Sequence, residues 1–189
     1  MSEPENTQMA EQTAPVLPAP VAIHPVSGKP FPTGTTEAWF AKAVPAPTSK
    51  NVHVQLGVHF EEVAETLTAL SMQGAADQAR AALAKALDDF AKALKTGDIY
   101  IDVVHTDWPE VGDGLGDTRV TATGSLHAIG AAVSAIIKEI DDSNFSKFVD
   151  GKAVFDENGK IAKGPDFFRP DVKKYIPATP PAFIVPQKV

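Results

Sequence analysis

The chain has 189 residues, of which 43% are apolar and 22% charged, and it carries a formal net charge of −7. This composition is typical of one packed domain with additional chain. It has no cysteine, which excludes disulfides, thiolate metal sites and a cysteine nucleophile. The negative charge disfavours binding to a nucleic acid polymer. No membrane span and no signal-peptide pattern are evident, so we expect a cytoplasmic protein.

Proline positions predict the boundaries of the ordered domain. Nine of the sixteen prolines lie in residues 1–47 and six in residues 165–186, and only Pro109 lies between them. Because proline removes a backbone donor and breaks helices, the middle of the chain is the part that can be helical. We therefore predict a disordered arm over residues 1–33, a helical domain over 34–150, and a C-terminal hairpin with an extended basic tail over 151–189.

Five helices are predicted in chain order, beginning near Thr36 and then covering about 50–71, 75–95, 107–129 and 131–148. The second has apolar residues at helical spacing, which predicts a core stripe made of Leu56, Phe60, Val63, Leu67 and Leu70. Residues 98–106 are compatible with a strand or a helical connection. Asn158-Gly159 favours a β-hairpin. The predicted fold is all-α, an antiparallel helical bundle with a small C-terminal β-hairpin and an extended tail.

Two groups of acidic residues lack basic neighbours in the sequence. Glu61, Glu62 and Glu65 lie within one turn of the second predicted helix, opposite its apolar stripe. The second group, on the fourth predicted helix, consists of Glu110, Asp113 and Asp117. No Lys or Arg lies between Lys50 and Arg80, or between Lys95 and Arg119. Like charges at this spacing cost about 0.2–0.5 kcal/mol per pair, so a divalent cation would relieve both groups, whereas a solvated helix face is the alternative.

The residue types narrow the metal and the chemistry. Carboxylates without cysteine or clustered histidine favour Mg²⁺, with Mn²⁺ as the alternative, over Zn²⁺. His59 is followed by Phe60, so the HExxH pattern is absent, and neither a P-loop nor a G-x-S-x-G motif is present. On charge alone, Lys147 is the best phosphate ligand, and Arg119, Lys160 and Lys163 are weaker candidates.

Three segments resemble, in the same order, the all-α nucleoside triphosphate pyrophosphohydrolases. QLGVHFEEVAETLTAL (55–70) is similar to the E-E-x-x-E helix of the MazG-like proteins, which are related to phosphoribosyl-ATP pyrophosphohydrolases and dimeric dUTPases. DGLGDTRVTATGSLHAIG (113–130) is similar to the D-x-L-x-D helix of a branch common in phages and bacteria. SNFSKF (143–148) and GKIAKGPDFFRPDV (159–172) resemble the C-terminal signature of that branch. Together the segments span about residues 36–173.

The resemblance implies a Mg²⁺-dependent enzyme that cleaves a nucleoside triphosphate between the α and β phosphates, giving monophosphate and pyrophosphate. It assigns catalytic roles to Glu61 and Glu62. The implied metal ligands are Glu62, Glu65, Asp113 and Asp117, with Glu110 as a substitute or supporting carboxylate. The implied substrate-binding residues are Asn144, Lys147, Gln55 and His59. It also implies a homodimer or homotetramer. A non-catalytic nucleotide-binding protein and a helical interaction protein are the alternatives.

Overall fold

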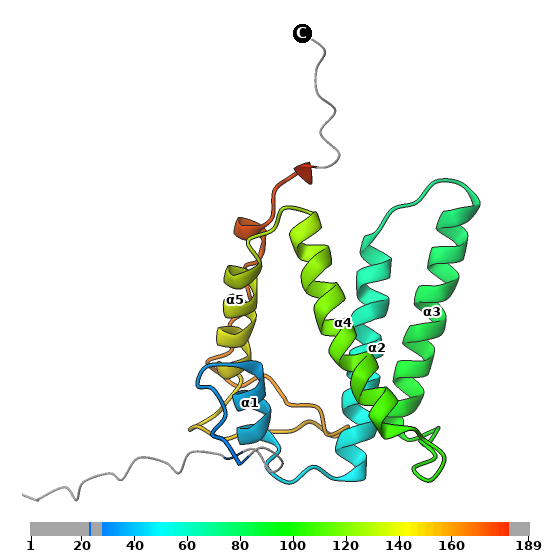
Figure 1. Cartoon of the computed structure of the whole chain (residues 1–189). Helices are drawn as coiled ribbons and strands as arrows, with labels where there is room; N and C mark the ends of the chain where they lie inside the picture. Colours follow the sequence, from blue (N-terminus) through cyan, green and yellow to red (C-terminus); the bar gives the residue numbers. More distant parts are fainter. Residues whose placement is uncertain (1–22, 24–27, 182–189) are drawn as a thin grey trace, which may run out of the picture.

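The computed structural model describes residue 23 and residues 28–181, and within these residues the fold is all-helical (Figure 1). Five α-helices follow one another: α1 (Thr36–Ala43), α2 (Ser49–Ala69), α3 (Ala75–Thr96), α4 (Trp108–Ala128) and α5 (Val133–Phe145). A 3-10 turn, η1, covers Lys173–Tyr175. The described part of the chain contains isolated β-bridges but no strand. The prediction of an all-α fold is confirmed, and the positions of the five helices agree closely with those expected.

Helices α2 and α3 form an antiparallel hairpin (Figure 1), and most of the residues buried in the two helices are glycine or alanine. Gly57 of α2 lies so close to α3 that an added Cβ would come within 2.8 Å of the Ala91 carbonyl oxygen. The residues buried along this contact are Val54, Gly57, Ala64, Ala84, Ala91 and Leu94. The predicted core stripe is therefore wrong in its detail, because its members are only partly buried and Leu70 is 46% exposed. Small side chains let the two backbones approach, which moves the buried face toward Gly57 and Ala64.

A second, separate core joins α1 to α5. Trp39 and Phe148 stack with their ring centroids 6.0 Å apart, and both are buried. The Trp39 indole Nε1 donates a hydrogen bond to the Asn144 carbonyl oxygen at 2.7 Å. The Thr36 hydroxyl donates to the buried Asp141 carboxylate. These contacts hold α1 across the C-terminal half of α5.

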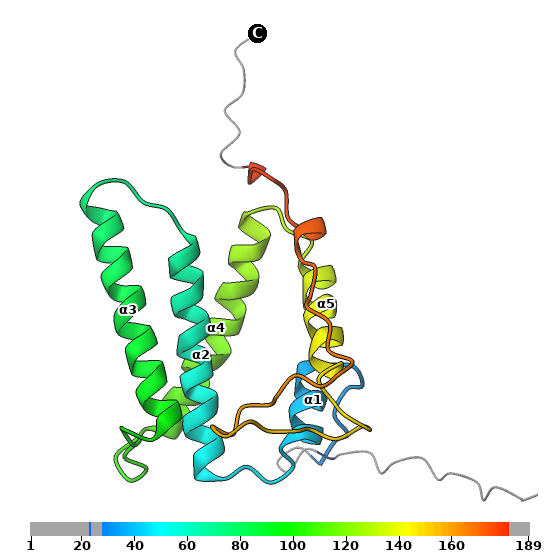
Figure 2. The same cartoon turned by 180° about the vertical axis from the view of Figure 1, so that it is seen from behind.

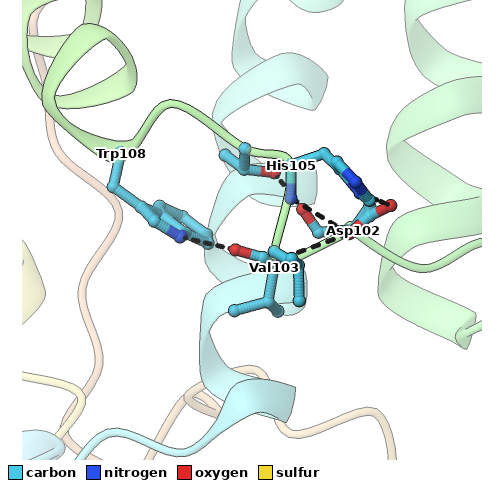
Figure 3. A network of polar contacts seen from close by, with 6 residues as sticks. Asp102, Val103, His105 and Trp108 are labelled. Carbon is cyan, nitrogen blue, oxygen red and sulfur yellow. Dashed lines mark hydrogen bonds and ion pairs between the residues drawn. The ribbon is translucent and has the colours of Figure 1, made fainter.

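Helix α4 lies over α2 in Figure 1 and buries none of its own residues. Its N-cap is Asp107, whose side chain accepts a hydrogen bond from the Glu110 amide at 3.2 Å, and Pro109 lies in the first turn. The preceding segment is a loop. Figure 3 shows that Asp102 organises it: its carboxylate accepts from the Val104 and His105 amides and contacts His105 Nδ1 at 2.7 Å.

The chain after α5 first extends to α2 and then returns along α5 (Figure 2). A turn at Asn158-Gly159 is closed by a single bridge between Phe155 and Ile161, and no strand extends from it within the described residues. Hydrogen bonds and an ion pair fix the returning segment to α5. Ser143 donates to the Phe168 carbonyl oxygen at 2.8 Å, and Glu139 accepts from the Asp171 amide and from Lys174.

Of the helices in the described residues, none combines the length and the apolar composition needed to cross a membrane.

Candidate functional site

The two cores enclose a cleft of about 900 Å³ between α1, α5 and the N-terminal half of α2. Its apolar wall includes Trp39, Phe40 and Ile161, and Ile23 and Phe31 from the predicted N-terminal arm also line it. Its polar wall is formed by Gln55 and Glu62 from α2 and by Asn144, Lys147 and Lys160. An apolar surface next to a mixed set of amide, carboxylate and ammonium groups suits a ligand that has a flat apolar part and a charged part.

Four of the residues predicted from sequence therefore meet in this cleft, although they come from segments about ninety residues apart. Gln55 and Glu62 lie on α2, and Asn144 and Lys147 lie at the end of α5. The α2 residues are presented on one face because they are separated by two helical turns. The turn after α5 points Lys147 back across the Trp39 ring, with its Nζ 5.4 Å from the ring centroid.

Glu62 carries a negative charge that its surroundings disfavour. Desolvation by the surrounding protein raises the pKa of Glu62, and repulsion from Glu65 and Glu61 raises it further, against weaker attraction from Lys160 and Lys147. Among the ion pairs of the described residues, none includes Glu62 or Glu65. Two unpaired carboxylates one turn apart are a donor set that fits a hard divalent cation such as Mg²⁺.

Glu61, the neighbour of Glu62, is fully engaged by two lysines. Its Oε1 pairs with Lys95 Nζ of α3 at 2.6 Å, and its Oε2 pairs with Lys160 Nζ at 3.2 Å. Burial alone would raise the pKa of Glu61, but the hydrogen bonds from Lys95 and Lys160 outweigh burial and lower the pKa. The predicted lack of neutralisation is thus wrong for Glu61, because its counter-charges come from distant parts of the sequence.

Lys147 is half-buried and held in place by a neutral partner. Its Nζ donates to the Asn144 Oδ1 at 2.8 Å. Burial lowers the pKa of Lys147, and repulsion from Lys160 and Lys163 lowers it further. An anion bound beside these lysines would favour the charged form of Lys147 and raise its pKa.

A smaller cleft of about 450 Å³ separates α2 from α4. It is lined by Gln55, His59, Trp108 and Leu115, among others, so Gln55 reaches both clefts whereas His59 reaches only the smaller one. The His59 ring also lies edge-on to Phe60, with the centroids 5.4 Å apart.

The acidic residues of α4 do not form one group with those of α2. Glu110, Asp113 and Asp117 are exposed. Across the residues that the structure describes, no three His, Asp or Glu side chains lie close enough together to hold a metal ion. Within the described residues, the four predicted metal carboxylates Glu62, Glu65, Asp113 and Asp117 are therefore not gathered into one site.

Trp39 has both of the roles considered for it, since it is buried and also forms part of the cleft wall. Lys95 is a further residue of the site that was not singled out from sequence, and its contact with Glu61 joins residues 34 positions apart. No local spacing signal indicates that contact.

Comparisons with protein-family models, with curated proteins and with solved structures gave no match.

Proposed function

We propose that this chain is a Mg²⁺-dependent nucleoside triphosphate pyrophosphohydrolase that releases monophosphate and pyrophosphate. One observation carries the proposal: Glu62 and Lys147 line the same cleft as the aromatic side chains of Trp39 and Phe40. A nucleotide offers both matching kinds of surface, a flat base and a polyanion. The resemblance of residues 36–173 to the MazG-like proteins, and to their all-α bundle, supports the same assignment.

In this proposal each polar side chain has a role that follows from its chemistry. Lys147, kept in place by Asn144, binds a phosphate oxygen. Gln55 offers an amide to the base or sugar, and His59 is the weaker candidate because it faces the smaller cleft. Glu62 and Glu65 would hold Mg²⁺, and the ion would supply positive charge that neutralises phosphate and activates water. The role of Glu61 in orienting water stays a prediction, and its two ion pairs favour a positioning role.

The acidic face of α4 supplies the remaining carboxylates in this proposal. Asp113 and Asp117, with Glu110 as a substitute or support, are the candidates. Because they do not group with Glu62 and Glu65 in the single chain, the proposal requires a closer approach of α4 to α2. That approach comes from the same chain or from a second copy.

A homodimer or homotetramer forms part of the same proposal. Helix α4 buries none of its residues and exposes apolar side chains, including Leu115 at 40% and Val120 at 67% exposure, which a partner subunit would cover.

A non-catalytic nucleotide-binding protein is the second candidate, since the same cleft would serve binding alone. Pyrophosphate release from a panel of common and modified nucleoside triphosphates, with and without Mg²⁺, separates the two. Metal-dependent release of pyrophosphate supports the enzyme, whereas binding of nucleotide without release supports the alternative.

A further inference from the structure

Residues 149–164, which we call the strap, form a closed loop that crosses from the end of α5 to α2. At its root, Gly164 lies against residues 147 and 149: an added Cβ would come within 2.9 Å of the Lys147 carbonyl oxygen and 2.8 Å of Val149 Cγ2. Two bridges, Val149–Lys152 and Phe155–Ile161, close the loop on itself. The strap is therefore fixed at the base of the proposed phosphate ligand Lys147.

The tip of the strap rests on α2. Asp156 accepts hydrogen bonds from the amides of Asn158 and Lys160 through its Oδ1, which shapes the turn. At Gly159, with a φ of +83°, an added Cβ would come within 3.2 Å of Lys50 Cε. Beside it, Lys160 reaches Glu61. Ile161 turns inward to the Trp39–Phe148 core, so the strap forms one wall of the cleft.

We propose that Lys160, delivered by the strap, is a second phosphate-binding residue that acts with Lys147 on the polyphosphate of the substrate. This inference rests on the proposed function and names a residue that it does not require. In the free protein Lys160 forms an ion pair with Glu61, and on ligand binding it exchanges this ion pair for a contact with phosphate. Both lysines line the same cleft, although Lys147 follows α5 and Lys160 lies at the strap tip.

The two ion pairs of Glu61 differ in a way that permits this exchange. The Lys95–Glu61 pair is short, at 2.6 Å, and its side chains are only 18% and 22% exposed. The Lys160–Glu61 pair is longer, at 3.2 Å, and the Lys160 side chain is 46% exposed. Exposed pairs are worth about 0.2–1 kcal/mol, so a phosphate can compete for Lys160. Glu61 then keeps Lys95 and is not left as an unpaired, partly buried charge.

The neighbouring lysine, Lys163, provides a matched control. It lies on the same strap, but its Nζ is 5.0 Å from the Phe167 ring centroid, and it is absent from the cleft wall. Exchanging Lys163 for glutamine removes the same charge from the same segment. Comparing the Lys160 and Lys163 variants therefore distinguishes a direct phosphate contact by Lys160 from the general electrostatic attraction of any lysine on the strap.

The test measures binding of inorganic pyrophosphate by titration calorimetry in the presence of Mg²⁺. We expect Lys160→Gln to weaken binding about tenfold, the effect of one charge-assisted hydrogen bond. Lys147→Ala should weaken it comparably, and Lys163→Gln less than about twofold at moderate salt. Gly159→Ala retains the lysine but strains the tip, and it should also weaken binding. Thermal unfolding of each variant shows that the fold is retained.

The experiment distinguishes failure of the phosphate-binding role of Lys160 from failure of the proposed hydrolase activity. Equal pyrophosphate affinity of Lys160→Gln and the wild type, equal losses in Lys160→Gln and Lys163→Gln, or no binding by the wild type would refute the role of Lys160. That conclusion holds whatever the turnover. If the chain releases no pyrophosphate from nucleotides but its pyrophosphate affinity depends on Lys160, the proposed hydrolase activity is refuted. The phosphate-binding role of Lys160 is then supported.

Discussion

Two adjacent glutamates should respond in opposite directions to the same substitution. Glu62→Gln removes a charge that is repelled by Glu65 and disfavoured by desolvation. One like-charge pair at this spacing is worth about 0.2–0.5 kcal/mol, so the variant should be more stable by that amount at pH 7. Glu61→Gln instead breaks ion pairs to Lys95 and Lys160, and we expect a loss of about 1 kcal/mol. In a chain of this size these changes shift Tm upward by about 1 °C and downward by about 2–4 °C.

The pH dependence distinguishes the two causes. The pKa of Glu62 is raised in the fold, so its charge is a penalty that exists above that pKa and disappears as the pH falls below the ordinary value. The pKa of Glu61 is lowered, so its contribution is present above the ordinary value and is lost only as the pH falls through the lowered one. Thermal unfolding of both variants between pH 3 and 7 measures this. Loss of stability in Glu62→Gln at pH 7, or a gain in Glu61→Gln, would refute the electrostatic account of α2.

Gly57→Ala should destabilise the fold by about 1–3 kcal/mol in denaturant unfolding, because its Cβ would collide with the Ala91 carbonyl of α3; a neutral result would show that the helices can separate at no cost. Deletion of residues 1–22 should leave Tm unchanged, whereas further deletion through residue 33 should weaken nucleotide binding, since Ile23 and Phe31 line the cleft. Light scattering should give a dimer or tetramer mass for the wild type and a lower mass for Leu115→Lys; a monomeric wild type would refute the proposed oligomer.

Local signals in the sequence predicted the helices well. Helix α4 begins after the N-cap Asp107, with Pro109 and Glu110 in its first turn, and α3 ends at Gly97, which adopts a φ of +79° as a C-cap. These features depend on residues within one turn of each other. The buried face of α2 was predicted less well, because large apolar residues indicate where a helix is apolar but not which small residues allow a neighbour to approach. The close contact at Gly57 depends on α3.

The cleft illustrates the same limit. The pairing of Gln55 and Glu62 with Asn144 and Lys147 was expected only through the family resemblance, and the structure brings the four side chains to one cleft. The neutralisation of Glu61 could not be predicted from spacing, because Lys95 and Lys160 lie 34 and 99 positions away. The pattern of charges along the sequence predicts ion pairs only between residues that are close together on one helix. Lysines from α3 and from the strap pair with Glu61, so that Glu62 is the glutamate of the two that has no ion pair within the described residues.

The most direct test of the central proposal is the product released from nucleoside triphosphates in the presence of Mg²⁺. The account predicts equimolar nucleoside monophosphate and pyrophosphate, both dependent on the metal, and loss of both in Glu62→Gln and in Asp117→Asn while each variant remains folded. The release of inorganic phosphate in place of pyrophosphate would contradict it. Full activity in either variant would contradict the assignment of these carboxylates to the metal.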